Sequence, residues 1–237
     1  MPNFPRTAEH AELDALFAHD LRSPIAAIAA NFGFIKTAPG VVGDPMALEA
    51  LRDVESATLV LQNLVDNMAL LSALESGPFE TAAEVVNLPE SVLGCLDRMG
   101  PITASSEVRV ESNIAPGAPG PRVFAVPTLL TAVVQNLYQT ALRHTTRREC
   151  VRVSVLTEGI CGVVEIRDGG APVPPALAEA LFTRAGQRVA KRESSSRYGR
   201  GLGLLVAGLA ARASGGSVQA VERDGKNAFR AAFKLAP

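Results

Sequence analysis

Two apolar stripes with the period of an α-helix dominate the first third of this chain. In residues 7–38 and again in 45–75, large apolar side chains recur every three or four positions, and a Pro-Gly pair separates the two stripes. Asp44 and Pro45 predict the start of the second helix, as its N-cap and its first helical residue. Such a pair of helices predicts an antiparallel hairpin, and a symmetric dimer forming a four-helix bundle would cover its apolar stripes. The stripes consist of Leu13, Phe17, Leu21, Ile25, Ile28, Phe32 and Ile35, and of Leu51, Val54, Leu61, Val65, Met68 and Leu71.

The pattern of apolar residues changes after Ser76-Gly77-Pro78. Beyond this point short β-like runs alternate with helical segments, which predicts a second domain with a mixed sheet. We therefore expect an α+β chain, with a helical hairpin over 7–76 and an α/β sandwich over 80–237. The predicted strands are 108–112, 122–125, 151–156, 162–167, 217–222 and 228–234, and the predicted helices are 88–98, 127–144, 175–183 and 203–214.

Composition excludes several classes of protein. The net charge is −1 and no long basic stripe occurs, which argues against a nucleic-acid partner. No apolar run reaches the roughly 18 residues of a membrane span, and the N-terminus lacks the apolar stretch of a signal peptide. The three cysteines lack metal-site spacing, as expected of reduced thiols. A cytoplasmic location is expected.

The first stripe carries a histidine with chemically useful neighbours. His19 lies off the apolar side of its helix, and its neutral imidazole is a nucleophile near pH 7. Asp20 could take the ring proton, and Ser23 shares the helical face of His19. Pro24 should bend the helix beside the reactive group. Considered alone, the His-Asp pair is more typical of a surface histidine on an amphipathic helix.

Three polar residues share one face of the predicted helix 127–144. Asn136, Thr140 and Arg143 lie three or four positions apart and combine an amide, a hydroxyl and a cation. Such a set suits a phosphate group that carries a magnesium ion. His144, next along, is expected to be an ordinary surface residue.

Two glycine-containing turns follow. Asp168 stands at the end of a predicted strand, with Gly170 in the turn, where its carboxylate could accept a hydrogen bond from an exocyclic amine. Further along, Gly199, Gly201, Gly203 and Leu204 lead directly into a predicted helix, whose N-terminus offers N–H groups to phosphates. Considered alone, the Asp168 segment is more often a simple turn, and glycine-rich turns before helices have several uses.

A basic segment, 183–198, separates the two turns. It contains five cationic side chains and one glutamate. This composition is typical either of a solvated loop or of a mobile lid over a triphosphate.

In this order, the motifs resemble those of the catalytic core of sensor histidine kinases of two-component signalling, over nearly all of residues 10–235. The correspondences are His19–Pro24 with the phosphoacceptor box, Gln135–Thr145 with the asparagine box, Asp168–Gly170 with the first glycine box, Leu181-Phe182 with the phenylalanine box, and Gly199–Leu204 with the second glycine box.

The resemblance implies an ATP-dependent kinase with magnesium. Asn136 would hold the metal, Asp168 would read adenine, and Arg143 would contact phosphates. His19 would attack the γ-phosphoryl group, with Asp20 as the base, and would pass the group to an aspartate of a response-regulator receiver domain. Ser23 would serve a reverse phosphatase activity. The hairpin would form the homodimer.

Two positions depart from the family pattern and keep alternatives open. Thr140 replaces a second asparagine of the asparagine box, and Pro172 replaces the last glycine of the first glycine box. Both favour a phosphotransfer protein with a degenerate ATP domain, whereas the complete second glycine box favours the kinase. A nucleotide-binding regulatory module without phosphoryl chemistry is a third interpretation. About ten residues precede the first helix, so we expect input from the hairpin or from a separate sensor protein.

Overall fold

The computed structural model describes residues 20–21, 24, 26–28, 30–31, 34–35, 40, 44–76, 81–115, 117, 119–192, 198 and 201–237. The chain divides into two compact units, Met1–Asp66 and Asn67–Pro237, which are described separately. This division falls inside the second long helix and not at the predicted boundary after Ser76, and the predicted domain limits stay a prediction.

Helix α2 (Pro45–Ser76) begins where the sequence predicts. The Asp44 carboxylate accepts a hydrogen bond of 2.9 Å from the Met46 N–H, and its carbonyl accepts one of 3.0 Å from Leu48. These bonds satisfy N–H groups that the first turn leaves without helical partners. The described positions between 20 and 35 are helical, and the antiparallel pairing of the hairpin lies outside the described residues.

Several apolar side chains of α2 face solvent. Met46, Leu48, Leu51 and Val65 are exposed, although the last two belong to the predicted stripe. By length and hydropathy alone, Pro45–Leu74 would also pass as a membrane span. The sequence reasoning overlooked this segment. Helices of soluble proteins meet the same criterion, so it assigns no location.

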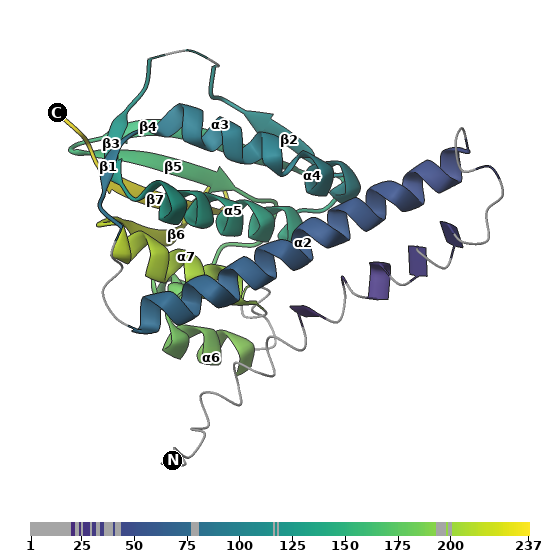
Figure 1. Ribbon diagram of the computed structural model, residues 1–237. Coiled ribbons are helices and arrows are strands. Elements are labelled where there is room, and N and C mark those ends of the chain that lie inside the picture. The colour runs from purple at the N-terminus through teal and green to yellow at the C-terminus, as the bar shows by residue number, and fades with distance from the viewer. Residues whose placement is uncertain are drawn as a thin grey trace. The chain divides into compact units, whose positions relative to one another are not determined.

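The second unit contains a mixed sheet, as predicted, and five of the six predicted strands form it, while 122–125 pairs elsewhere (Figure 1). Its strand order is β2-β4-β5-β7-β6, with β2 and β4 parallel and the other neighbours antiparallel. A separate antiparallel pair joins β1 to β3. The strands are β1 (Glu84–Asn87), β2 (Arg109–Ser112), β3 (Arg122–Ala125), β4 (Cys150–Glu158), β5 (Cys161–Arg167), β6 (Ser217–Arg223) and β7 (Lys226–Lys234).

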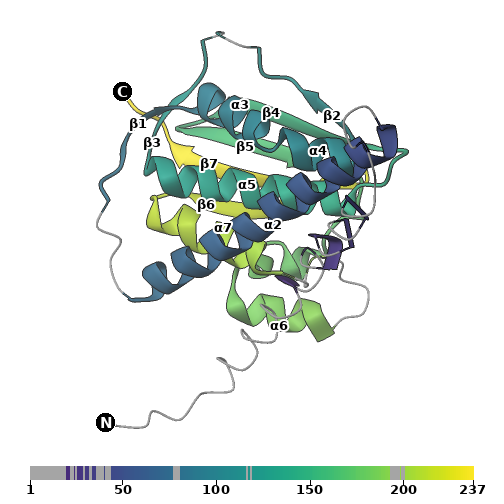
Figure 2. The same ribbon diagram turned by 45° about the vertical axis from the view of Figure 1, so that its right-hand side comes forward.

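Helices α3, α5 and α7 cover one face of this sheet (Figures 1 and 2). Apolar side chains between the two layers, such as Leu137, Ile166 and Phe229, are fully buried. On β5 and β7, Glu165 and Arg230 alternate with these residues and form an ion pair of 3.2 Å on the opposite face. The helices of this unit are α3 (Leu88–Arg98), α4 (Gly100–Ser106), α5 (Pro127–His144), α6 (Arg184–Arg192) and α7 (Leu202–Ala213).

A two-residue turn joins β6 to β7. Arg223 pairs with Lys226 across the hairpin, and Asp224 and Gly225 between them have φ angles of 51° and 73°. Positive φ at both positions is the requirement of the type I′ turn, whose twist matches that of the flanking strands.

The structure corrects one predicted element and adds others. The predicted helix over 175–183 is wrong, because this segment forms two single 3₁₀ turns, Pro175–Leu177 and Ala180–Phe182. Both turns are closed by hydrogen bonds between residues three apart, from the Leu177 N–H to the Pro174 carbonyl at 2.8 Å and from the Thr183 N–H to the Ala180 carbonyl at 2.9 Å. The sequence reasoning also missed β1, α4 and α6, which are short or lack an apolar period.

Candidate functional site

The pairing of β5 with β7 brings Asp168 beside Asn227. The pairing continues one step beyond the strand, since the Asp168 N–H donates to the Asn227 carbonyl at 3.0 Å, and the Asn227 N–H donates to the Gly170 carbonyl at 3.1 Å. The Asn227 side-chain amide also donates to Oδ2 of Asp168 at 2.9 Å. Asp168 is 1% exposed, so a carboxylate lies within the layer between sheet and helices.

Burial controls the acidity of this carboxyl group. Loss of hydration raises the pKa of Asp168 to about 6, against the opposing effect of hydrogen bonds from Asn227, the Gly170 N–H and Tyr198. The Gly170 N–H lies 2.7 Å from Oδ1. Near pH 7 the group is therefore mostly a buried anion, which binds hydrogen-bond donors strongly.

Tyr198 supplies the third donor. Its hydroxyl lies 3.1 Å from each carboxylate oxygen of Asp168. Its ring centroid lies 4.4 Å from that of His144 and 5.5 Å from that of Phe229. His144, predicted to be a surface residue, is half-buried in this contact. A Cβ atom at Gly170 would stand 2.2 Å from the Tyr198 hydroxyl, so only glycine leaves room for it.

A second set of contacts fixes the backbone of the turn after β5. The Gly169 N–H donates to Oγ1 of Thr145 at 2.9 Å, and its carbonyl accepts from Nζ of Lys226 at 3.0 Å. Lys226 also forms an ion pair with Glu149, and this hydrogen bond is the main cause of the lowered pKa of Glu149. Thus the segment after α5 and the strand β7 both hold the Asp168 turn.

Asn136 lies where α5 meets the start of α7. It is 1% exposed, and a Cβ atom on Gly203 would stand 2.8 Å from its Oδ1. Its amide group donates to the Ala132 carbonyl at 2.8 Å. Within the same unit, Asn136 and Asn67 exchange two side-chain hydrogen bonds, of 2.7 and 2.8 Å. An amide oxygen has two lone pairs, so Asn67 uses part of the acceptor capacity that a cation would need.

The other predicted residues of this helix differ in their surroundings. Thr140 is buried, and its hydroxyl donates to the Asn136 carbonyl at 2.7 Å, which is a bond within the helix. Arg143 is exposed. The structure therefore separates the exposed cation from the buried amide and hydroxyl that the sequence places on its helical face.

The second glycine turn is described from Gly201 onward. Gly201 is extended, with φ −166° and ψ 162°, and α7 begins after it without a side-chain cap. The first N–H groups of a helix without such a cap suit an anionic ligand. Leu204 is 2% exposed and belongs to the core, so only its backbone can contribute. Gly199 lies outside the described residues.

The predicted phosphoacceptor motif is described only in part. His19 and Ser23 lie outside the described residues, while Asp20 is helical and half-buried. The roles predicted for these residues and for the nucleotide-binding positions stay predictions.

The structure adds residues that the sequence reasoning missed, chiefly Asn227 and Tyr198. Asn227 is fully buried, and its Oδ1 has no hydrogen-bond partner among the described residues. The buried carboxylate of Asp168, this amide oxygen and the space beside Gly170, which the Tyr198 hydroxyl fills, are together complementary to the polar edge of a planar heterocycle. Asn227 directly precedes the predicted strand 228–234, so the local pattern gave no clue to its role.

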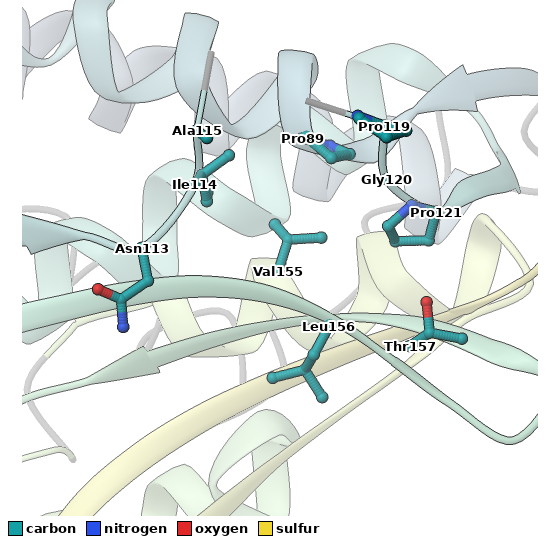
Figure 3. Close-up of a pocket in the computed structure, with 10 residues that line it drawn as sticks. All are labelled: Pro89, Asn113, Ile114, Ala115, Pro119, Gly120, Pro121, Val155, Leu156 and Thr157. Carbon is teal, nitrogen blue, oxygen red and sulfur yellow. The ribbon is translucent and has the colours of Figure 1, made fainter. Parts of the chain in front are cut away.

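A separate pocket of about 610 Å³ lies between the start of α3, β4 and the loop before β3 (Figure 3). It is lined mostly by proline and aliphatic side chains, such as Pro89, Pro121 and Val155. None of the predicted site residues lines it.

Comparison with known proteins identifies the second unit. Residues 125–237 match the family described as histidine kinase-, DNA gyrase B- and HSP90-like ATPases. The signal transduction histidine-protein kinase AfsQ2 of Streptomyces coelicolor is 26% identical over 215 residues, which cover 86% of this chain and 37% of AfsQ2. The probable sensor histidine kinase TcrY of Mycobacterium tuberculosis is 27% identical over 224 residues, covering 92% of this chain and 44% of TcrY. The chain thus spans less than half the length of these relatives.

Solved structures support the same fold. The histidine kinase AdeS of Acinetobacter baumannii superimposes with a TM-score of 0.56 at 19% identity, covering 92% of this chain and 98% of AdeS. Full-length ShkA in complex with AMPPNP gives a TM-score of 0.58 at 18% identity, over 97% of this chain and 45% of ShkA. Residues 125–237 thus match the family of histidine kinase-, DNA gyrase B- and HSP90-like ATPases, and the chain has a fold similar to that of these solved histidine kinases.

Proposed function

We propose that this protein is a two-component histidine kinase that phosphorylates itself on His19 with ATP and magnesium. The observation that carries the proposal is the buried carboxylate of Asp168, placed by the β5–β7 pairing beside Asn227. A buried anion in a family of ATPases supports recognition of an adenine amine.

The described residues give each part of the nucleotide a binding group. Asp168 accepts the hydrogen bond of the base amine. The N–H groups after Gly201 bind phosphate oxygens, and Arg143, which is exposed, supplies a cation. Asn136 offers an amide oxygen to magnesium, which neutralises phosphate charge when bound. A ligand at Asn136 competes with Asn67 for that oxygen.

His19 carries the chemistry. Its unprotonated ring nitrogen forms a bond to the γ-phosphorus while the bond to the β,γ-bridging oxygen breaks, and ADP leaves. Asp20 takes the proton released by the imidazole. The phosphoryl group then passes to a carboxylate of a response-regulator receiver domain. Ser23 serves the reverse phosphatase reaction.

Assembly and location are part of the same proposal. The exposed apolar residues of α2, Met46, Leu48, Leu51 and Val65, support a homodimer through the helical hairpin, since burying them would be favourable. A separate sensor protein would supply the stimulus to a cytoplasmic kinase.

Labelling with γ-³²P-ATP and magnesium tests the proposal. The wild-type protein should acquire acid-labile label, and His19→Ala should acquire none while still binding ATP. Label that persists in His19→Ala would contradict the assignment of His19. Label accepted only from a phosphorylated regulator would favour the phosphotransfer alternative, for which the described residues and the comparisons give no specific support.

A further inference from the structure

The base-binding carboxylate already has an aromatic hydrogen-bond donor. The Tyr198 hydroxyl lies 3.1 Å from both oxygens of Asp168, and the tyrosine is 7% exposed. Tyr198 lies three residues before Gly201, on the segment that leads into the second glycine turn. A residue that directly precedes the second glycine turn, the proposed phosphate site, thus forms a hydrogen bond with Asp168, the proposed base reader.

The phenol also has the shape of a base analogue. It is a flat ring with one polar donor at its edge, and it contacts the rings of His144 and Phe229 at centroid distances of 4.4 and 5.5 Å. Gly170 leaves space for its hydroxyl, because a Cβ atom there would stand 2.2 Å from that oxygen. A purine amine bound to Asp168 would need the same space and the same acceptor lone pairs.

We propose that Tyr198 is an internal competitor that occupies the base subsite and must leave Asp168 before a nucleotide binds. The inference rests on the proposed nucleotide-binding function. Tyr198 then sets affinity, because every bound nucleotide must replace the hydrogen bonds and ring contacts of the phenol. The class of ligand that displaces it is a planar heterocycle with an exocyclic amine.

Two tyrosines and no tryptophan make the competition directly measurable. The other tyrosine, Tyr138, is 1% exposed, and its hydroxyl lies 2.8 Å from Oγ1 of Thr103. In a Tyr138→Phe protein with ¹³C-labelled tyrosine rings, all tyrosine NMR signals come from Tyr198. Titration with ADP and magnesium should move these signals toward the positions of a solvent-exposed ring.

Affinity supplies the second measurement. Tyr198→Phe removes the donor but keeps the ring, so the Kd for ADP should fall about tenfold, which is what loss of one competing hydrogen bond to a charged group implies. Tyr138→Phe is the matched control, with the same atom removed from the other buried tyrosine, and its Kd should equal that of the wild-type protein.

The outcomes separate this inference from the proposed function. An unchanged or higher Kd for Tyr198→Phe, or ADP binding without movement of the Tyr198 signals, overturns the competition alone. Failure of the wild-type protein and of Tyr198→Phe to bind ADP overturns the nucleotide-binding function and the inference with it. The contact itself is checked without nucleotide, because Asp168→Asn should shift the Tyr198 ring signals in the Tyr138→Phe background.

Discussion

Asn227 and Asp168 are bound to each other twice, once through the backbone at 3.0 Å and once through the side chains at 2.9 Å. The two residues stand 59 positions apart in the sequence, and the register of β5 with β7 brings them together. This pairing makes Asn227 a structural support of the Asp168 carboxylate.

Asn227→Ala should therefore destabilise the fold and weaken nucleotide binding. Removal of a donor from a buried, charged acceptor costs about 1–3 kcal/mol of the free energy of unfolding. Urea denaturation near pH 7 measures this loss. Gln219→Ala, at an exposed position on the neighbouring strand β6, is the control and should change stability by less than about 0.5 kcal/mol. Equal effects of the two substitutions would refute a special role for Asn227.

The raised pKa of Asp168, about 6 against a usual value of 3.8, predicts a pH dependence of stability. Between these values the folded protein binds more protons at this site than the unfolded chain, so the free energy of unfolding decreases as pH rises from about 4 to 6. The full effect is about 3 kcal/mol for a buried group with this shift. The negative charge of Glu149 acts in the same direction. Comparison of wild type with Asp168→Asn across this range isolates the contribution, and parallel curves would disprove it.

Nucleotide binding should show the opposite pH dependence. In the proposed function the ionised carboxylate of Asp168 accepts a hydrogen bond from the base amine, so the affinity for ADP should increase as pH rises through about 6. Isothermal titration at pH 5.5 and pH 7.5 tests this, with Asp168→Asn as the control that should lose most of the difference. Equal affinity of the wild-type protein at both values would argue against Asp168 as the base reader.

Gly203→Ala tests the contact between α7 and Asn136. The new methyl group would stand 2.8 Å from Oδ1 of Asn136, so the amide must shift and binding of magnesium-ADP should weaken several-fold. Gly94→Ala is a matched control inside helix α3, where the nearest atom would be 3.7 Å away. There the substitution should leave binding unchanged and stabilise the helix by up to about 1 kcal/mol. If both proteins bind alike, Asn136 does not hold the metal.

Gly208→Ala should disturb packing and not the site. A Cβ atom at this position would stand 2.2 Å from the backbone carbonyl oxygen of Phe182, which cannot rotate away as a side chain can. Overpacking of this kind costs about 1–3 kcal/mol, so the melting temperature should fall. A protein as stable as Gly94→Ala would show that the backbone at Phe182 adapts.

Local patterns predicted much of the fold. The apolar period of α5 and the Asp-Pro start of α2 each placed a helix correctly, because these signals depend on neighbours within a few positions. The mixed sheet followed from short strands alternating with helices. The prediction of a helix over 175–183 was wrong, because this segment forms two separate 3₁₀ turns closed by hydrogen bonds between residues three apart.

Local sequence patterns predicted less of the candidate site. Asp168 was found because it ends a strand and begins a glycine turn. Its partners Tyr198 and Asn227 come from positions 30 and 59 residues away, and only tertiary pairing reveals them. Tyr198 in particular belongs to a basic, polar segment whose composition gives no sign of a contact with Asp168.

The Asp224-Gly225 turn carries a consequence for how such a domain can change over evolution. Successive side chains of a strand point to opposite faces of the sheet. One residue inserted into or removed from this hairpin would therefore move the side chains of Asn227 and Lys226 each to the face opposite its present one. The length of the turn between β6 and β7 is thus constrained as tightly as the identity of a side chain that contacts a ligand. Substitutions of residues on the outer face of this hairpin should be tolerated, whereas insertions and deletions in it should not.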